Sequence, residues 1–369
     1  MIDTIKLVIP YTERPKWIYK VRQEHALDAA RGVSRTNINP GNTYKVLGLY
    51  RPRMTYIERP KPGGKTFSLN IELSLPKLMY GNNFKELKDT HFDTLTKKLS
   101  KVLKDTYGVW LLPDVLANAT VSRVDYSKNI VFNDYTPVST IINSMKTADI
   151  SKVYDIQATN FKNGGHIHHI HTNSIDIAMY DKVADLKQEK ISPKRSHEKD
   201  GYSQTDILNI FDNNKSVSVA RFEVRLNGVK KIKAELAAIG TVCGLTFREM
   251  YSNQLARTIL LKHWNVILDK IPKALLDTDT PEQLLLNIAK ANPSIKAREA
   301  LAIVGMKLIK DKQDERYVRN LMETLFSPSQ YKRLHKKSNE IPKATQLKTL
   351  LKVSEVISKM EPISVYDYS

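Results

Sequence analysis

The sequence predicts an α+β protein, in which an antiparallel sheet with packed helices is followed by an all-α C-terminal domain. Three observations predict it. Up to about residue 245, several segments alternate apolar and polar residues, which is the period of half-buried strands. Segments of helical spacing lie between some of them. Beyond residue 245 only the helical spacing recurs, so we divide the 369 residues into domains 1–245 and 246–369.

Several of the predicted strands have an apolar face opposite a polar one, whereas 120–132 has a mixed pattern. The predicted strands are 4–9, 44–57 with a break at Pro52, 66–75, 120–132, 166–171, 175–180 and 217–226. In 66–75 the polar face carries Glu72, and in 217–226 it carries Glu223. The polar faces of these strands are therefore where we look for chemistry.

The predicted helices have apolar residues three and four positions apart. They are 92–107, which stops at Gly108, then 138–145, 255–271, 282–291, 297–309 and 317–325. Residues 12–42 are predicted to form loop with some helix, 190–205 an exposed loop, and the tail after residue 362 a frayed end.

Charge and composition restrict the function. The 58 Lys and Arg exceed the 39 Asp and Glu by 19, which favours polyanionic partners such as DNA, RNA or an acidic membrane surface. The single cysteine, Cys243, excludes a disulfide framework within the chain and fits a reducing cytoplasm. No stretch approaches 18 apolar residues, so we expect neither a signal peptide nor a membrane span.

Two motifs invite a ligand. PGGKT at 62–66 lacks the first glycine of a phosphate-binding loop, because Arg59 stands there, and we interpret it as a turn between strands. HIHHIH at 166–171 places His169 and His171 on one strand face and the other two histidines opposite. His169 and His171 suit half of a divalent metal site, while an exposed polar hairpin without function is the alternative.

One tyrosine lies among the polar faces. Tyr180 ends its strand on the side opposite the apolar residues, as Glu72 and Glu223 do on theirs, and Asp125 sits in a further strand. If the strands pair, these carboxylates and the histidines could hold a cation that polarises a phosphate while the phenol attacks it. Lys182 could stabilise the developing negative charge.

Two basic runs suit contacts with a phosphate backbone, although solvated surface is the plainer interpretation of each. These runs are Lys230, Lys231 and Lys233, and Lys332, Arg333, Lys336 and Lys337.

The chain resembles the gene II replication proteins of filamentous phages and their plasmid and prophage relatives. The resemblance runs through MIDTIKLVIPY at 1–11, NIELSLPKLMYG at 70–81, ANATVSRVDYS at 117–127, IAMYDK at 177–182 and ARFEVRL at 220–226, and continues over 297–341. Their order is more specific than any one segment. The resemblance does not extend to HIHHIH, so His169 and His171 are proposed as ligands from their spacing alone.

The resemblance implies rolling-circle DNA replication in the cytoplasm of a bacterial host. Domain 1–245 would be the catalytic nickase and strand-transferase core, and 246–369 an accessory or DNA-binding domain. Tyr180 matches the family nucleophile, which would nick one strand of a double-stranded origin, keep the 5′ end as a phosphotyrosine and later rejoin it. Mg²⁺ or Mn²⁺, a host helicase and a polymerase would take part. The alternatives are a non-enzymatic origin-binding regulator, and a transposase, relaxase-like or RNA-processing nuclease with the same chemistry.

Overall fold

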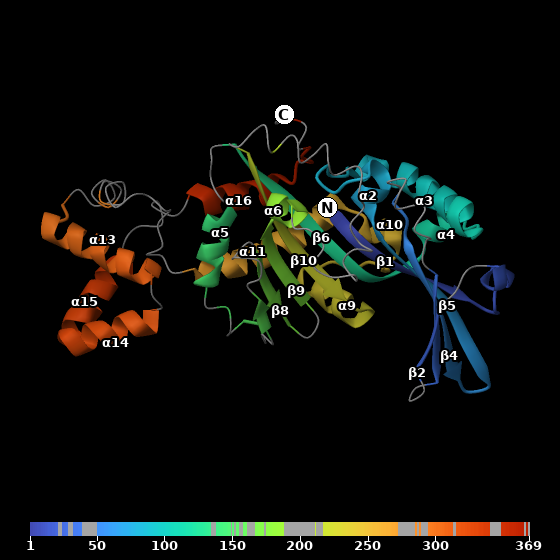
Figure 1. Cartoon of the computed structure of the whole chain (residues 1–369), viewed down its shortest axis with the longest axis horizontal. Coiled ribbons are helices and arrows are strands. Elements are labelled where there is room, and N and C mark those ends of the chain that lie inside the picture. Colours follow the sequence, from blue (N-terminus) through green and yellow to red (C-terminus); the bar gives the residue numbers. More distant parts are fainter. Residues whose placement is uncertain are drawn as a thin grey trace. The chain divides into compact units, whose positions relative to one another are not determined.

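The computed structural model describes most of the chain as mixed helix and antiparallel sheet, as predicted (Figure 1). The described residues are 1–20, 24–28, 32–38, 50–133, 138–148, 150, 153–154, 158–160, 167–172, 175–187, 211, 217–271, 285, 288, 294–312, 315–339, 348–364 and 367. They form two compact units, 1–138 with 154–263 and 356–369, and 139–153 with 264–355. Each unit is considered by itself.

The first unit is built on a ten-stranded sheet in the order β2-β3-β4-β5-β1-β6-β10-β9-β8-β7, with every neighbouring pair antiparallel. The strands are β1 (Ile2–Tyr11), β2 (Glu24–Asp28), β3 (Val33–Ile38), β4 (Arg53–Lys61), β5 (Gly64–Ser74), β6 (Thr120–Phe132), β7 (Ala158–Asn160), β8 (Ile167–His171), β9 (Ile175–Asp181) and β10 (Ser218–Asn227). The predicted strands near β1, β5, β6, β8, β9 and β10 are confirmed.

The N-terminal part of the sheet shows where the pattern is weak. The PGGKT segment is the tight turn between β4 and β5, where Gly63 and Gly64 have φ of 77° and 154°, values that favour glycine. β4 begins directly after Pro52, and residues 44–49 of the predicted strand 44–57 lie outside the described residues. Residues 12–42, predicted as loop with some helix, contain the 3₁₀ helix η1 (Lys16–Lys20) and also β2 and β3, which lie at one end of the sheet and show no regular alternation of apolar residues.

One face of the sheet is the apolar core. Ile5 of β1 pairs with Leu73 on one side and with Val124 on the other, and Val124 pairs with Leu226 of β10. All four side chains are at most 1% exposed. These cross-strand neighbours fix the register, because a shift of one residue would turn every apolar side chain to the opposite face.

The described helices of the first unit are short except for α3 and the start of α11. They are α2 (Leu75–Tyr80), α3 (Phe92–Tyr107), α4 (Pro113–Ala117), α6 (Lys182–Lys187), α9 (Val229–Ala238), α10 (Phe247–Met250) and residues 253–263 of α11 (Asn253–Lys270), with the 3₁₀ helix η2 (Asp89–His91). α3 confirms the predicted helix and ends at Gly108, which adopts φ of 66°. Phe247 of α10 packs on Phe92, with 5.1 Å between ring centroids, and its N–H donates to the Ala119 carbonyl. Residues 246–263 therefore belong to the first unit, whereas the sequence placed them in the C-terminal domain.

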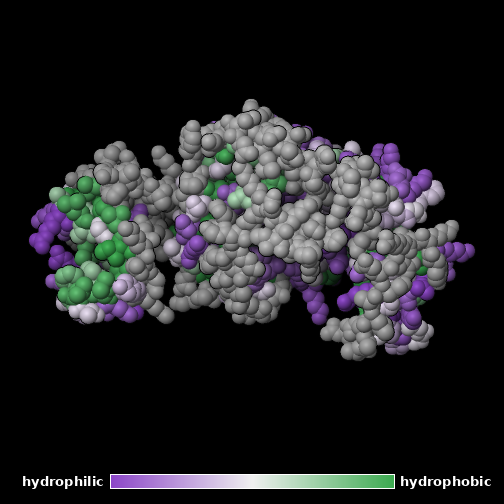
Figure 2. Space-filling view, in the orientation of Figure 1, coloured by the Kyte–Doolittle hydropathy of each residue, from purple (hydrophilic) through white to green (hydrophobic). Residues whose placement is uncertain are grey.

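The described elements of the second unit are helices. They are α5 (Val138–Lys146) from residue 139, the C-terminal turns of α11 (Asn253–Lys270), then α13 (Ala297–Lys312), α14 (Glu315–Leu325), α15 (Pro328–Asn339) and most of α16 (Lys348–Lys359). Trp264 donates to the Ser354 hydroxyl at 2.7 Å. Apolar side chains also gather on the surface of α13 and α14 (Figure 2), at Leu301, Leu308, Ile309, Tyr317 and Leu325. The predicted loop 190–205, and all but Leu285 and Ile288 of 282–291, lie outside the described residues.

Candidate active site

The strand register places the predicted polar faces on a single face of the sheet. Asp125 of β6 pairs with Arg225 of β10, Arg225 with Asp176 of β9, and Asp176 with His171 of β8. The next row up the face holds Glu223, and the row beyond it holds Tyr180. The carboxylates, histidines and tyrosine named from the sequence thus project to the same side.

The same register separates the predicted metal ligands. Neighbouring strands lie about 4.8 Å apart, and β5 is five strands from β8, so Glu72 lies roughly 24 Å from the histidines. Asp125, three strands from β8, has its Cα about 14 Å from that of His171. Metal–ligand bonds are near 2 Å, so neither carboxylate joins His169 and His171 around one ion. Of the predicted acidic ligands, only Glu223, two strands away, lies closer to them.

Arg123 binds both of the distant carboxylates. Its Nη2 and Nε lie 2.8 and 3.0 Å from the two oxygens of Asp125, and its Nη1 lies 3.5 Å from Glu72 Oε1. Burial raises the pKa of Asp125 to about 7, and the nearby Glu223 adds to this, although the charge of Arg123 opposes it. A carboxylate held at both oxygens by a guanidinium has little capacity left for a cation.

Glu223 is buried at 3% exposure and is also paired. Arg225 Nη2 lies 3.0 Å from Glu223 Oε2. Burial alone would raise the pKa of Glu223, but the charges of Arg225 and Arg221 and the hydrogen bond from Arg225 together outweigh it, and the net pKa is lowered. Ala178 lies between Glu223 and His169 in the same row.

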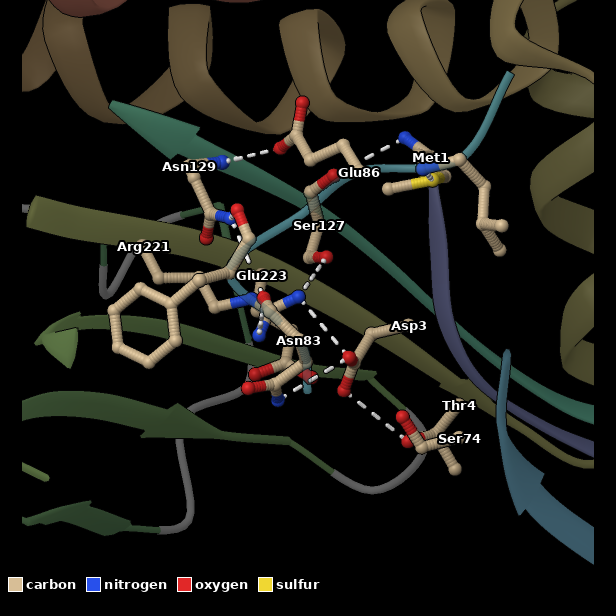
Figure 3. Close-up of polar contacts among 12 residues, drawn as sticks. Met1, Asp3, Thr4, Ser74, Asn83, Glu86, Ser127, Asn129, Arg221 and Glu223 are labelled. Carbon is tan, nitrogen blue, oxygen red and sulfur yellow. Dashed lines mark hydrogen bonds and ion pairs between the residues drawn. The ribbon is translucent and has the colours of Figure 1, made fainter. Parts of the chain in front are cut away.

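A buried network anchors the row that carries Tyr180 (Figure 3). Arg221 is fully buried, and its Nη2 lies 3.0 Å from Asp3 Oδ1 and 2.9 Å from Ser127 Oγ. Thr4 Oγ1 donates to the other oxygen of Asp3 at 3.2 Å. Arg221 faces Tyr180 across the β10–β9 pair. The fixed guanidinium is therefore a positive charge beside the phenol.

Tyr180 lies at the end of β9 and is partly exposed, as expected for a residue on the polar face. Burial raises its pKa well above the usual value, Glu223 adds to this, and Arg221 acts in the opposite direction. The hydroxyl is therefore protonated at neutral pH, and a reaction at its oxygen needs an acceptor for the proton.

Lys182 lies beside Tyr180 because α6 begins immediately after β9. Asp181 caps this helix, since its Oδ1 accepts from the N–H groups of Val183 and Ala184, each at 2.9 Å. Lys182 is 6% exposed, and its Nζ lies 5.6 Å from the centroid of the Tyr180 ring. Burial, with the charge of Arg221, lowers the pKa of Lys182 to about 7.

His169 and His171 form a cluster with Asp176, a residue that the sequence did not identify as a ligand. Their ligand atoms lie within 4.8 Å of one another, and His171 Nδ1 is 3.0 Å from Asp176 Oδ1. Asn227 Nδ2 donates to Asp176 Oδ2 at 3.3 Å. The register that sets Asp176 opposite His171 is the signal that would have identified it, and this register requires knowledge of the strand pairing.

His169 is prepared to bind a cation. Burial lowers its pKa to about 4, assisted by the charge of Arg225, so the imidazole is neutral at pH 7 and has a lone pair to offer. Its Nε2 is buried and has no hydrogen-bond partner among the residues that the structure describes. His168 turns to the core face, as the alternation predicts, and His166 lies outside the described residues. Tyr180 and His169 are diagonal neighbours on β9 and β8, so their Cα atoms lie about 7–8 Å apart.

The two basic runs lie in different units. Lys230 and Lys233 are exposed on α9, where Lys231 reaches Glu235 at 4.0 Å. In the second unit, α15 exposes the side chains of Lys332, Arg333 and Lys336, whereas the side chain of Lys337 lies outside the described part of the chain. Both runs stay candidates for phosphate contacts.

No protein-family model, curated protein or solved structure matches the chain. Among the described helices, none combines the length and the apolar character that crossing a membrane requires.

Proposed function

We propose that this protein initiates rolling-circle DNA replication as a relative of the gene II replication proteins. It would nick one strand of a double-stranded origin and later rejoin the displaced strand, with Tyr180 as the nucleophile. One observation carries the proposal: a partly exposed tyrosine lies on the same sheet face as a cluster of two histidines and an aspartate, and His169 of this cluster is its diagonal neighbour. The net charge of +19 favours a nucleic-acid substrate.

In this reaction Tyr180 Oη attacks a backbone phosphorus and gives its proton to solvent. The bond from phosphorus to the 3′ oxygen breaks, the 3′ oxygen takes a proton from solvent, and the 5′ end stays on the protein as a phosphotyrosine. The covalent link conserves the energy of the bond, so rejoining needs no nucleotide cofactor. Arg221 and protonated Lys182 are the positive charges that offset the negative charge developing at this end of β9.

His169, His171 and Asp176 would hold the divalent cation. When bound, the cation would act as a Lewis acid toward the scissile phosphate. Imidazole ligands suit transition metals, whereas Mg²⁺ prefers an all-oxygen set, so of the two expected ions this cluster favours Mn²⁺.

Removing Asp176 is expected to weaken metal binding. Asp176→Asn takes the only carboxylate from the cluster and leaves the two imidazoles, so we expect Mn²⁺ affinity to fall at least about tenfold. Titration calorimetry, or the electron-spin resonance signal of free Mn²⁺, measures this. His91→Gln, in η2 and outside the cluster, is the control and should bind as the wild type does. Equal affinity in Asp176→Asn would remove the cluster from the proposal.

The activity is tested with supercoiled plasmid that carries the origin of the encoding replicon, in the presence of Mn²⁺ or Mg²⁺. Wild-type protein is expected to give nicked circles with protein on the 5′ end, and Tyr180→Phe is expected to lower their yield by at least about a thousandfold, because it removes the attacking oxygen. Tyr317→Phe, at a position 52% exposed on α14, is the matched control and should nick normally.

The runner-up functions are outcomes of the same assay. A non-enzymatic origin binder would retard the plasmid without nicking it. Nicking that persists in Tyr180→Phe would reject this residue as the nucleophile, and cleavage of RNA in place of DNA would indicate a processing nuclease. We further propose that a host helicase and a polymerase act with the protein, and that it acts in the cytoplasm.

A further inference from the structure

A second tyrosine of the first unit is hydrogen-bonded to a histidine that is itself held by a carboxylate. Tyr154 Oη lies 2.7 Å from His263 Nδ1, and His263 Nε2 lies 3.0 Å from Glu235 Oε1. Glu235 comes from α9 and His263 from α11, and both are at most 4% exposed, whereas Tyr154 is partly exposed. Tyr154 is therefore a potential nucleophile, His263 a potential base in contact with it, and Glu235 the group that orients this base.

These contacts determine which ring nitrogen of His263 carries a hydrogen and which can accept the proton of Tyr154. The carboxylate of Glu235 only accepts, so His263 Nε2 must carry the hydrogen that it donates. In a neutral ring Nδ1 is then the acceptor, and it receives the hydrogen bond of the Tyr154 hydroxyl. The two rings are tilted by only 29°, with their centroids 5.9 Å apart. His263 is thus placed to take the phenolic proton.

The charges around Tyr154, His263 and Glu235, which we call the relay, also favour transfer of the phenolic proton to His263. Burial would raise the pKa of Glu235, but hydrogen bonds from His263 and Lys262 outweigh it and hold the pKa at about 2, so the group is an anion. Burial and this anion raise the pKa of Tyr154. The phenol therefore does not ionise by itself at neutral pH, and its reactivity depends on His263 acting as general base, with the resulting imidazolium stabilised by Glu235.

The neighbouring charges indicate the substrate class. Lys262 Nζ lies 2.5 Å from Glu235 Oε1 and Lys231 Nζ lies 4.0 Å from Oε2, with both lysine side chains partly exposed. Lys230 and Lys233 stand on the same helix, α9, and are exposed. Lys262 and Lys231 beside Glu235, with two further exposed lysines on the same helix, suit a polyanionic phosphodiester better than a neutral or cationic substrate.

We propose that Tyr154 is a second nucleophile for phosphodiester transfer, separate from Tyr180, with His263 as its general base and Glu235 holding His263 in place. The inference takes its DNA substrate from the proposed function. Tyr154 Oη forms a bond to phosphorus, the bond from phosphorus to the 3′ oxygen breaks, the phenolic proton moves to His263 Nδ1, and the leaving 3′ oxygen takes a proton from water. The reverse step, with the 3′ hydroxyl as nucleophile, restores the strand and returns the proton to Tyr154.

The first test measures activation of the phenol without DNA or metal. The full chain is treated with an aryl fluorosulfate, which sulfates nucleophilic phenols, and labelled tyrosines are quantified by peptide mass spectrometry. A general base typically contributes about a hundredfold or more, so Tyr154 is expected to react at least about tenfold faster than the more exposed Tyr317. His263→Gln should remove this advantage, and Glu235→Gln should reduce it while the melting temperature reports folding. Slow labelling of Tyr154, or labelling unchanged in both folded variants, would overturn the proposal.

The second test separates the two tyrosines. A single-stranded oligonucleotide pool of random sequence is incubated with Mn²⁺ and protein, and the nucleotide-bearing peptide is identified by mass spectrometry. An adduct at Tyr154 that survives Tyr180→Phe and disappears in Tyr154→Phe supports the second nucleophile, even if the nicking assay rejects Tyr180. An adduct that forms only at Tyr180 keeps the proposed function and overturns this inference.

Discussion

Replacing Arg221 by methionine is expected to lower the free energy of unfolding of the first unit by about 3–5 kcal/mol, because the change leaves the buried carboxylate of Asp3 without its partner. Asp3→Asn strands the fully buried guanidinium instead, and a comparable loss is expected. The double variant Asp3→Asn with Arg221→Met leaves no unpaired charge, so its loss should be clearly smaller than the sum of the single losses.

Chemical denaturation, together with hydrogen exchange of the β6 and β10 amides, measures this coupling. Hydrogen exchange is needed because the chain has two units and a single transition cannot be assumed. The control is Arg14→Met, which removes the exposed Arg14 from its pair with Glu58 at 3.1 Å. Lys65 still pairs with Glu58 at 3.2 Å, so the change should cost no more than about 1 kcal/mol. If Arg221→Met were as mild as this control, the pair would not be the anchor of the row that carries Tyr180.

The strands were predictable where burial on one face is strict. In β1, β5 and β10 apolar residues recur at period two, and Ile5, Leu73 and Leu226 lie in one core. The alternation assigned Glu72 and Glu223 to the opposite face before any pairing was known, whereas Asp125 lies in a strand of mixed pattern. β2 and β3 escaped prediction because they lie at one end of the sheet, where a strand needs little apolar surface.

The composition of the site was less predictable, because alternation gives the face of a residue and not the order of the strands. Glu72 and His171 have equivalent patterns in the sequence, yet five strand spacings separate them in the sheet. Asp176 lies between apolar residues of β9 and becomes a partner of His171 only through the β8–β9 register. The arginines that neutralise Asp125 and Glu223 stand two residues from them on the same strands, and this spacing was the available sign that these carboxylates are paired.

Contacts between residues distant in sequence account for the other features that were not predicted. Phe247 packs on Phe92 across more than 150 residues, so the boundary between the units does not follow the point at which strands end and helices begin. Ile363, in the tail predicted to fray, donates to Glu86 Oε2 at 3.2 Å, a bond that links residues 277 positions apart. Tyr154 and His263 are 109 positions apart, and neither belongs to a motif.

Lys182→Met is expected to stabilise the first unit in a strongly pH-dependent way. Above about pH 10.5 lysine is neutral in both the folded and the unfolded chain and its burial costs little. As the pH falls, the unfolded chain binds the proton first, and the wild type loses stability until Lys182 itself protonates near pH 7. At 1.36 kcal/mol per pH unit the loss reaches at most about 5 kcal/mol, so the advantage of Lys182→Met should grow from pH 10 to pH 7 and then level off. Lys101→Met, on the exposed face of α3, is the control and should show no such trend.

The titration of Lys182 also decides whether it acts on Tyr180 as a positive charge or as a proton acceptor. Lys182 Nζ stands 5.6 Å from the phenol ring, and only its protonated form can offset the negative charge that develops during attack. We therefore expect the nicking rate to fall as the pH rises through about 7, and this fall to be absent in Lys182→Met, whose rate should be low and flat. If the wild-type rate instead rose through the same range and the dependence vanished in the variant, the neutral amine would be the acceptor of the phenolic proton. Lys182 would then be a general base beside Tyr180, the role that His263 fills beside Tyr154.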